Sequence, residues 1–152
     1  MTSKSKDNKM HRATADKLKR ELTERIVSYN ANEDNPIVIN RAVIFGSYVN
    51  NPEREMLSDL DVGIEYGPRY EGEKQKKIVD DSFEYITMIA PSYERKFSNP
   101  LFGKWDAARR FMAIGLRGGS HYISLHRINE DAAIFDKKVE EIDVGEIVRS
   151  VE

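Results

Sequence analysis

Residues 42–66, AVIFGSYVNNPEREMLSDLDVGIEY, decide the fold that we expect for this chain. The stretch opens with an apolar run at 42–45, which is typical of a strand buried on both faces. Gly46 and Ser47 end this run, and the missing Cβ of glycine allows a ligand to approach the backbone closely. A polar loop and a second apolar run follow. The pattern therefore predicts two strands that are joined by a loop.

Two acidic residues, Asp59 and Asp61, open the second predicted strand. Because side chains alternate along a strand, both carboxylates should lie on one face while Leu60 points into the core. At a rise of roughly 3.3 Å per residue, the two positions are about 7 Å apart along the strand. Paired carboxylates at this spacing can share divalent cations, which prefer hard oxygen ligands. In two-metal sites, such ions clamp a transferring phosphoryl group.

The order of these residues resembles a known family. Gly46-Ser47, a spacer of eleven residues and then Asp59-Leu60-Asp61 are similar to the signature of the nucleotidyltransferases of the DNA polymerase β superfamily. The small, stand-alone minimal nucleotidyltransferases are the most similar type. Ser58 also fits, because Ser-Asp-x-Asp is common in that family. The spacer is one residue longer than the family usually has, and it lacks the usual Arg-Gly near its start.

The resemblance implies a single-domain enzyme that transfers a nucleoside monophosphate from a nucleoside triphosphate to an acceptor, which is a protein, an RNA or a small molecule. It implies that Asp59 and Asp61 are the catalytic residues and hold Mg²⁺ or Mn²⁺. It also implies that Gly46, Ser47 and Ser58 contact the nucleotide. Phosphoryl transfer depends mainly on positioning and charge neutralisation, which explains the need for carboxylates and polar turn residues.

The family usually supplies a third carboxylate from a later strand, and this chain departs from that pattern. The strand expected at residues 121–128, HYISLHRI, contains no acidic residue. His126 on this strand, Asp143 in the C-terminal part and Glu84 on a predicted helix are the candidates for the third position. A site without a third acid binds nucleotide but turns over slowly or not at all. The alternative function is therefore a catalytically weak or inactive binding module with the same fold, which holds a nucleotide or a partner protein as an antitoxin does.

Composition and charge limit the other classes of function. The 152 residues suit one domain, which we expect at residues 11–152 after a disordered tail at 1–10. The 24 basic and 26 acidic residues nearly balance, so the net charge predicts no DNA binding. The chain has no cysteine, which excludes disulfides and thiolate metal sites. The sequence shows neither a membrane span nor a secretory signal, so a cytoplasmic location is expected.

Hydrophobic periodicity predicts an α+β fold in which helices pack on a small mixed sheet. Apolar residues at helical spacing predict a helix that starts soon after the tail and ends near residue 31, a second over 72–90 and a third over 105–116. Residues 91–104 carry two prolines and a glycine, and they are expected to be irregular.

Residues 93–117 hold the chain's main concentration of basic and aromatic side chains. Interleaved residues of these types suit phosphate contacts and base stacking, although such a run is more often an exposed helix face with core aromatics. A third hypothesis is therefore an adaptor that binds nucleic acid through this segment. The members are Tyr93, Arg95, Lys96, Phe97, Lys104, Trp105, Arg109, Arg110, Phe111 and Arg117.

Overall fold

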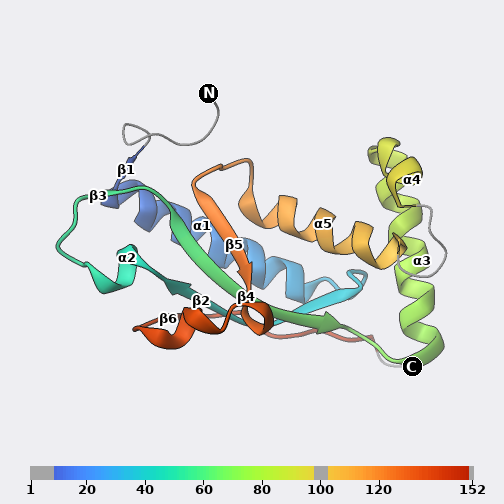
Figure 1. Ribbon diagram of the computed structural model, residues 1–152. Coiled ribbons are helices and arrows are strands. Elements are labelled where there is room, and N and C mark those ends of the chain that lie inside the picture. Colours follow the sequence, from blue (N-terminus) through green and yellow to red (C-terminus); the bar gives the residue numbers. More distant parts are fainter. Residues whose placement is uncertain (1–8, 98–102, 151–152) are drawn as a thin grey trace.

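A four-stranded mixed sheet forms the centre of the computed structural model, which describes residues 9–97 and 103–150 (Figure 1). The strands lie in the order β5-β4-β2-β6. β2 pairs antiparallel with both β4 and β6, whereas β4 and β5 are parallel. The predicted mixed sheet with packed helices is thus confirmed. The strand bounds are Ile37–Phe45 for β2, Leu60–Pro68 for β4, Ile123–Arg127 for β5 and Glu140–Ile142 for β6.

The apolar run at 42–45 belongs to one long strand, β2, which starts at Ile37. A register shift between Ile39 and Arg41 forms a β-bulge in the strand. As a result, core residues before and after the bulge point to the same face of the sheet. At the other end, Phe45 lies opposite Asp61 of β4. The two strands of the 42–66 stretch are therefore neighbours, as predicted, and the end of β2 lies beside the start of β4.

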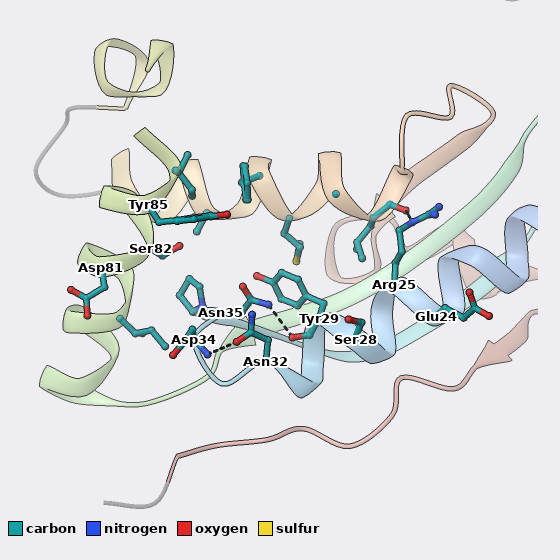
Figure 2. A pocket seen from close by; sticks show the side chains of 18 residues that line it. Glu24, Arg25, Ser28, Tyr29, Asn32, Asp34, Asn35, Asp81, Ser82 and Tyr85 are labelled. Atoms are coloured by element: carbon teal, nitrogen blue, oxygen red, sulfur yellow. Dashed lines mark hydrogen bonds between the residues drawn. The ribbon is translucent and has the colours of Figure 1, made fainter. Parts of the chain in front are cut away.

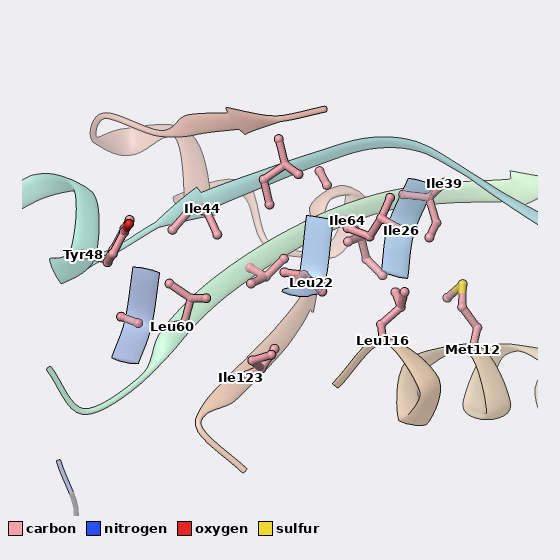
Figure 3. Packing of buried hydrophobic residues seen from close by; sticks show 14 of the residues in the cluster. Leu22, Ile26, Ile39, Ile44, Tyr48, Leu60, Ile64, Met112, Leu116 and Ile123 are labelled. Carbon is pink, nitrogen blue, oxygen red and sulfur yellow. The ribbon is translucent and has the colours of Figure 1, made fainter. Parts of the chain in front are cut away.

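Helices α1 (Arg12–Ala31) and α5 (Gly103–Arg117) cover one face of the sheet (Figure 1). Figure 3 shows Leu22 and Ile26 of α1 against the strands, with Leu116 of α5 beside them. These side chains are almost completely buried. Burial of each large apolar side chain contributes about 1.5–3 kcal/mol. The helical stripe predicted from the sequence is thus confirmed as the core face of α1.

Two short 3₁₀ segments, η1 (Ile128–Glu130) and η2 (Ala132–Asp136), cover the opposite face of β4. The contact depends on Gly63, because a Cβ there would lie 3.1 Å from Ile134 and 3.2 Å from Ile128. Both faces of the strand are therefore covered near its start, which explains why the apolar runs are continuous rather than alternating.

Helices α3 (Gly72–Ile89) and α4 (Ser92–Lys96) lie at the end of the molecule opposite α2 (Figure 1). α3 packs mainly on α5, and its buried anchor is Ile86. The helix predicted over 72–90 is confirmed. The prediction that residues 91–104 are irregular is wrong at both ends, because α4 occupies the first part of this segment and α5 starts at Gly103.

The N-terminal boundary of the fold differs from the prediction. Residues 1–8 of the predicted tail lie outside the described residues, but Met10 is buried and belongs to β1 (Met10–His11). β1 pairs with β3 (Met56–Leu57), two residues before Asp59. Neither two-residue strand is long enough to show a period in the sequence. No helix among the described residues has both the length and the apolar character needed to cross a membrane.

One arginine, Arg69, is buried directly after β4. Its guanidinium donates hydrogen bonds to five backbone carbonyl oxygens, at the end of α1, in the turn before β2, in β2 itself and near the C-terminus. Burial lowers the pKa of Arg69 from its ordinary high value. The carbonyl dipoles at the C-terminal end of α1 favour a cation there. The acceptors belong to Tyr29, Asn30, Asn35, Ile37 and Val148.

Candidate functional site

The turn at Gly46 lies directly against the Asp61 carboxylate. A Cβ built on Gly46 would lie 2.6 Å from Asp61 Oδ2, closer than real Cβ contacts. The backbone of Gly46 also has a positive φ of 79°, which disfavours any side chain. The pairing of Phe45 with Asp61 produces this approach, because the next residue after Phe45 turns back across the start of β4. Glycine is therefore required here for two independent reasons.

Ser47 begins the short helix α2 (Ser47–Asn50) immediately after this turn. Its hydroxyl oxygen accepts a hydrogen bond of 3.3 Å from the Arg54 guanidinium. Sequence reasoning placed Arg54 in an exposed polar loop and missed this contact. The side chain of Arg12 holds the loop by donating to the carbonyl oxygens of Arg54, Tyr48 and Asn51 at 2.8–3.0 Å. A cationic group thus lies beside the Ser47 hydroxyl.

The anchor of α2 is Tyr48, which is buried and donates a hydrogen bond from its hydroxyl to Asp16 of α1. Burial and the hydrogen bond to Asp16 both raise the pKa of Tyr48. The Arg12 guanidinium lies over its ring, 5.0 Å from the centroid. The Gly46-Ser47 turn is therefore attached to the first helix, and not only to the strands.

Asp59 lies one residue before β4, and its Oδ1 atom is shielded from solvent. The adjacent Leu60 amide donates to the Tyr122 carbonyl oxygen at 2.8 Å, which ties this corner to the start of β5. Asp59 lines a hollow of about 650 Å³ together with Ser124 and Arg117. Ser58, the other residue expected at the nucleotide, is exposed between β3 and β4.

His126 on β5 lies beside Asp61. Its Nε2 atom is 3.8 Å from Asp61 Oδ1, and its Nδ1 atom is 3.7 Å from Asp131 Oδ2. Ser124 lies within 3.1 Å of Nε2, and the Phe45 ring packs edge-on against the imidazole with centroids 5.1 Å apart. Ser124 is in register with Asp61, and His126 with Gly63. The β5 positions beside Asp61 are thus occupied by a hydroxyl and an imidazole.

Asp131 is an acid near this end of the sheet that sequence reasoning missed. It precedes η2, in an irregular connection without a periodic signal. The two acids proposed from the sequence lie elsewhere. Asp143 follows β6 and accepts a local hydrogen bond from the Gly145 amide, and β6 is on the far side of β2 from β4. Glu84 is exposed on α3. Neither of them is near Asp61.

Within residues 9–97 and 103–150, no three His, Asp or Glu side chains are close enough to form a metal centre as they stand. Asp61 offers hard oxygen donors at the Gly46 turn, with His126 beside it and Asp131 on the other side of His126. Asp59 lies two residues before Asp61 in the chain. The Asp61 carboxylate fills the place that a side chain of residue 46 would take. The donor chemistry at this corner is therefore suited to a hard divalent cation.

A separate cavity of about 890 Å³ lies between the second half of α1, α3 and α5 (Figure 2). Its lining includes Glu24, Tyr29 and Asn35 on one side and Asp81 and Tyr85 on the other. None of the residues at the Gly46 turn borders it. The cavity is thus independent of the carboxylates.

Comparisons of the chain with protein-family models, with curated proteins and with solved structures gave no match. The geometry at the Gly46 turn and the resemblance of the sequence motif are therefore the indications of function.

Proposed function

We propose that this protein is a nucleotidyltransferase that transfers a nucleoside monophosphate from a nucleoside triphosphate to an acceptor hydroxyl. One observation carries the proposal: the Gly46 backbone lies directly against the carboxylate of Asp61, where the ends of two paired strands meet. A turn without a side chain brings backbone N–H groups, which suit a phosphate, next to a carboxylate, which suits its counter-ion. The order of motif residues in the sequence supports the same conclusion.

Asp59 and Asp61 would hold Mg²⁺ or Mn²⁺, since carboxylates are the ligands that these hard cations prefer. The bound cation would neutralise charge on the triphosphate and on the leaving pyrophosphate. The Ser47 hydroxyl and the Arg54 guanidinium, which are 3.3 Å apart, offer donors for phosphate oxygens. The Arg12 side chain would keep this loop in place through its three backbone contacts.

The reaction forms a bond between the acceptor oxygen and the α-phosphorus. It breaks the bond from the α-phosphorus to the oxygen that bridges to the β-phosphorus, and pyrophosphate leaves with that electron pair. The proton of the acceptor hydroxyl passes to solvent water. The role that we assign to the chain is to align the donor phosphates at the Gly46 turn with an acceptor that approaches along β5.

A second function is a binding module that holds a nucleoside triphosphate, or a partner protein, without transferring a nucleotide. The observation that favours it is the pair Ser124 and His126, which replace an acid on the strand next to Asp61. In this case the chain binds the triphosphate with Mg²⁺, but no labelled acceptor appears.

The test is titration calorimetry with ATP, GTP, CTP and UTP in turn, with and without Mg²⁺. We expect Mg²⁺ to strengthen the binding of at least one of them. The double variant Asp59→Asn with Asp61→Asn should lose this strengthening and remain folded, because removing two neighbouring negative charges relieves their repulsion in the metal-free protein. Equal affinity with and without Mg²⁺ in the wild type would refute the proposal.

A second experiment separates the enzyme from the binding module. The protein is incubated with α-labelled triphosphates, Mn²⁺ or Mg²⁺, and a cell lysate that supplies protein, RNA and small-molecule acceptors. A labelled acceptor that is absent with the double variant supports transfer. Firm Mg²⁺-dependent binding without any labelled product supports the module.

A further inference from the structure

A basic groove runs between helix α5 and strand β5, which is the edge strand of the sheet beside β4. The groove has a volume of about 540 Å³. Its lining combines residues of α5 with residues from the end of β5, including His126. Because His126 also lies beside Asp61, the groove and the candidate site share this residue.

Four arginines line this α5–β5 groove: Arg109, Arg110, Arg117 and Arg127. Among the described residues of the lining, the acids are Asp106 and Glu130, so four positive charges minus two negative charges leave +2. The whole chain, in contrast, has a formal charge of −2. The positive charge is thus concentrated at one place, which the balanced composition of the chain conceals.

Two of these arginines are held in place by hydrogen bonds to other side chains, and the other two can donate to a ligand. Arg109 donates to the Tyr66 hydroxyl at 2.9 Å and to Asp106 at 2.8 Å, while Arg127 donates to Glu130 at 3.1 Å. The guanidinium groups of Arg110 and Arg117 make no hydrogen bond or ion pair with another described residue, and Arg110 is exposed. Their donors can therefore be used by a ligand.

Aromatic rings lie among these charges. The Arg127 guanidinium stacks on the Tyr66 ring, 4.6 Å from its centroid, and its Nε donor is buried without an acceptor among the described residues. Phe97 forms part of the same lining. Arginine planes and aromatic faces that border a positive groove are the features that hold single-stranded nucleic acids.

The groove continues towards Asp59. The hollow that contains Asp59 shares Ile114, Arg117 and Leu125 with the α5–β5 groove. A chain lying along β5 would therefore pass the arginines and then reach Asp59. A compact anion would occupy only one end, whereas an extended polymer of phosphates matches the whole length.

We propose that the α5–β5 groove binds the phosphate backbone of a single-stranded nucleic acid and delivers its terminal hydroxyl to Asp59 and Asp61. The role as acceptor rests on the proposed transferase function. Binding of the strand does not, because the arginines act without triphosphate or metal. The two ideas can therefore fail separately.

The test is fluorescence anisotropy with a labelled 12-nucleotide RNA of mixed sequence and the matching DNA, without triphosphate or divalent metal, from 50 to 400 mM salt. For single strands, log K falls with log salt by about 0.7 per neutralised phosphate. With two to four arginines engaged, the expected slope is about −1.4 to −2.8. The RNA and DNA arms show whether the sugar matters, and binding of either strand supports the proposal.

The double variant Arg110→Gln with Arg117→Gln should flatten the slope by about 1.4 and weaken binding at 0.1 M salt by about 25-fold. Arg110→Lys with Arg117→Lys should keep most of the slope, because it keeps the charges. The matched control is Lys17→Gln with Arg20→Gln, two exposed positions on α1 that lose the same charge. Circular dichroism checks that each variant is folded.

Failure of both strands to bind, or an equal loss in the α1 control, would overturn the proposal. Asp59→Asn with Asp61→Asn should bind the oligonucleotide at least as tightly as the wild type, while losing the Mg²⁺-dependent binding of triphosphate. If triphosphate binding depends on Mg²⁺ but no oligonucleotide binds, the groove inference is wrong and the transferase proposal stands.

Discussion

The substitution Gly46→Ala tests the contact on which the site depends. The added methyl group would lie 2.6 Å from Asp61 Oδ2, and φ at this residue is 79°. A strained backbone of this kind costs about 1–3 kcal/mol for a residue with a side chain. Turning the Asp61 side chain away from its rotamer adds about 0.5–1.5 kcal/mol. We expect the free energy of unfolding to fall by about 2–4 kcal/mol.

Thermal unfolding measures the first consequence. In a chain of this length, each kcal/mol changes Tm by about 2–4 °C, so Gly46→Ala should lower Tm by about 5–15 °C. Calorimetric titration measures the second consequence. The affinity for triphosphate in the presence of Mg²⁺ should fall by about 10–100-fold, the usual effect of disturbing a metal ligand's support. The affinity without Mg²⁺ should change much less.

The matched control is Gly115→Ala. Gly115 lies in α5, has no positive φ, and a Cβ there would meet no atom within 4 Å. Alanine in a helix is favoured over glycine by roughly 0.5–1 kcal/mol, so Tm should rise slightly and triphosphate binding should not change. If Gly46→Ala keeps the wild-type Tm and the wild-type Mg²⁺ effect, the close approach to Asp61 does not organise the site.

Two further predictions concern the fold and the reaction. Arg69→Met should lower the free energy of unfolding in urea by about 3–5 kcal/mol, because five carbonyl oxygens lose a buried cationic donor. The free energy of unfolding of Arg69→Lys, which has three donors, should lie between those of the wild type and the Met variant. Wild-type stability of the Met variant would contradict this expectation. We expect the wild type to transfer nucleotide more slowly than about 1 s⁻¹. His126→Asp should raise this rate and should increase the response of the rate to Mg²⁺ relative to Mn²⁺. An unchanged rate would show that an acid at this position of β5 does not complete the site.

The sequence predicted the centre of the fold because its signals are local. The apolar run at 42–45 and the spacing of Ala15, Leu22 and Ile26 depend only on strand and helix periods, and both patterns are confirmed. The neighbouring position of β2 and β4 follows from a short connection between two hydrophobic strands. Periodicity could not reveal β1 and β3, because each has only two residues.

The residues that sequence reasoning missed depend on tertiary contacts between irregular segments. Arg54 is seven residues from Ser47 in a loop, and only the folding of that loop against Arg12 brings them together. Asp131 reaches His126 because β5 is followed directly by two 3₁₀ segments that cross the sheet. Arg69 was also missed, because its acceptors come from four separate parts of the chain.

The register of β5 against β4 is what separates the two proposed functions. Ser124 lies opposite Asp61, and His126 follows two residues later on the same face of β5. An acid at either position would therefore lie beside Asp61, and neither position carries one. Asp131 is the nearest substitute, but the imidazole stands between it and Asp61, 3.7 Å from one and 3.8 Å from the other. The negative charge of Asp131 would be farther from a cation at Asp61 than the charge of a direct ligand, because the imidazole lies between them. It would therefore stabilise the cation less. The same imidazole borders the α5–β5 groove, where an acceptor strand would enter. An acid at that position would repel the phosphates of the strand, whereas a histidine does not. A histidine where the resemblance implies an acid would thus favour binding of a polyanion at the expense of cation affinity, which is the balance expected if the proposed site holds its acceptor firmly and transfers slowly.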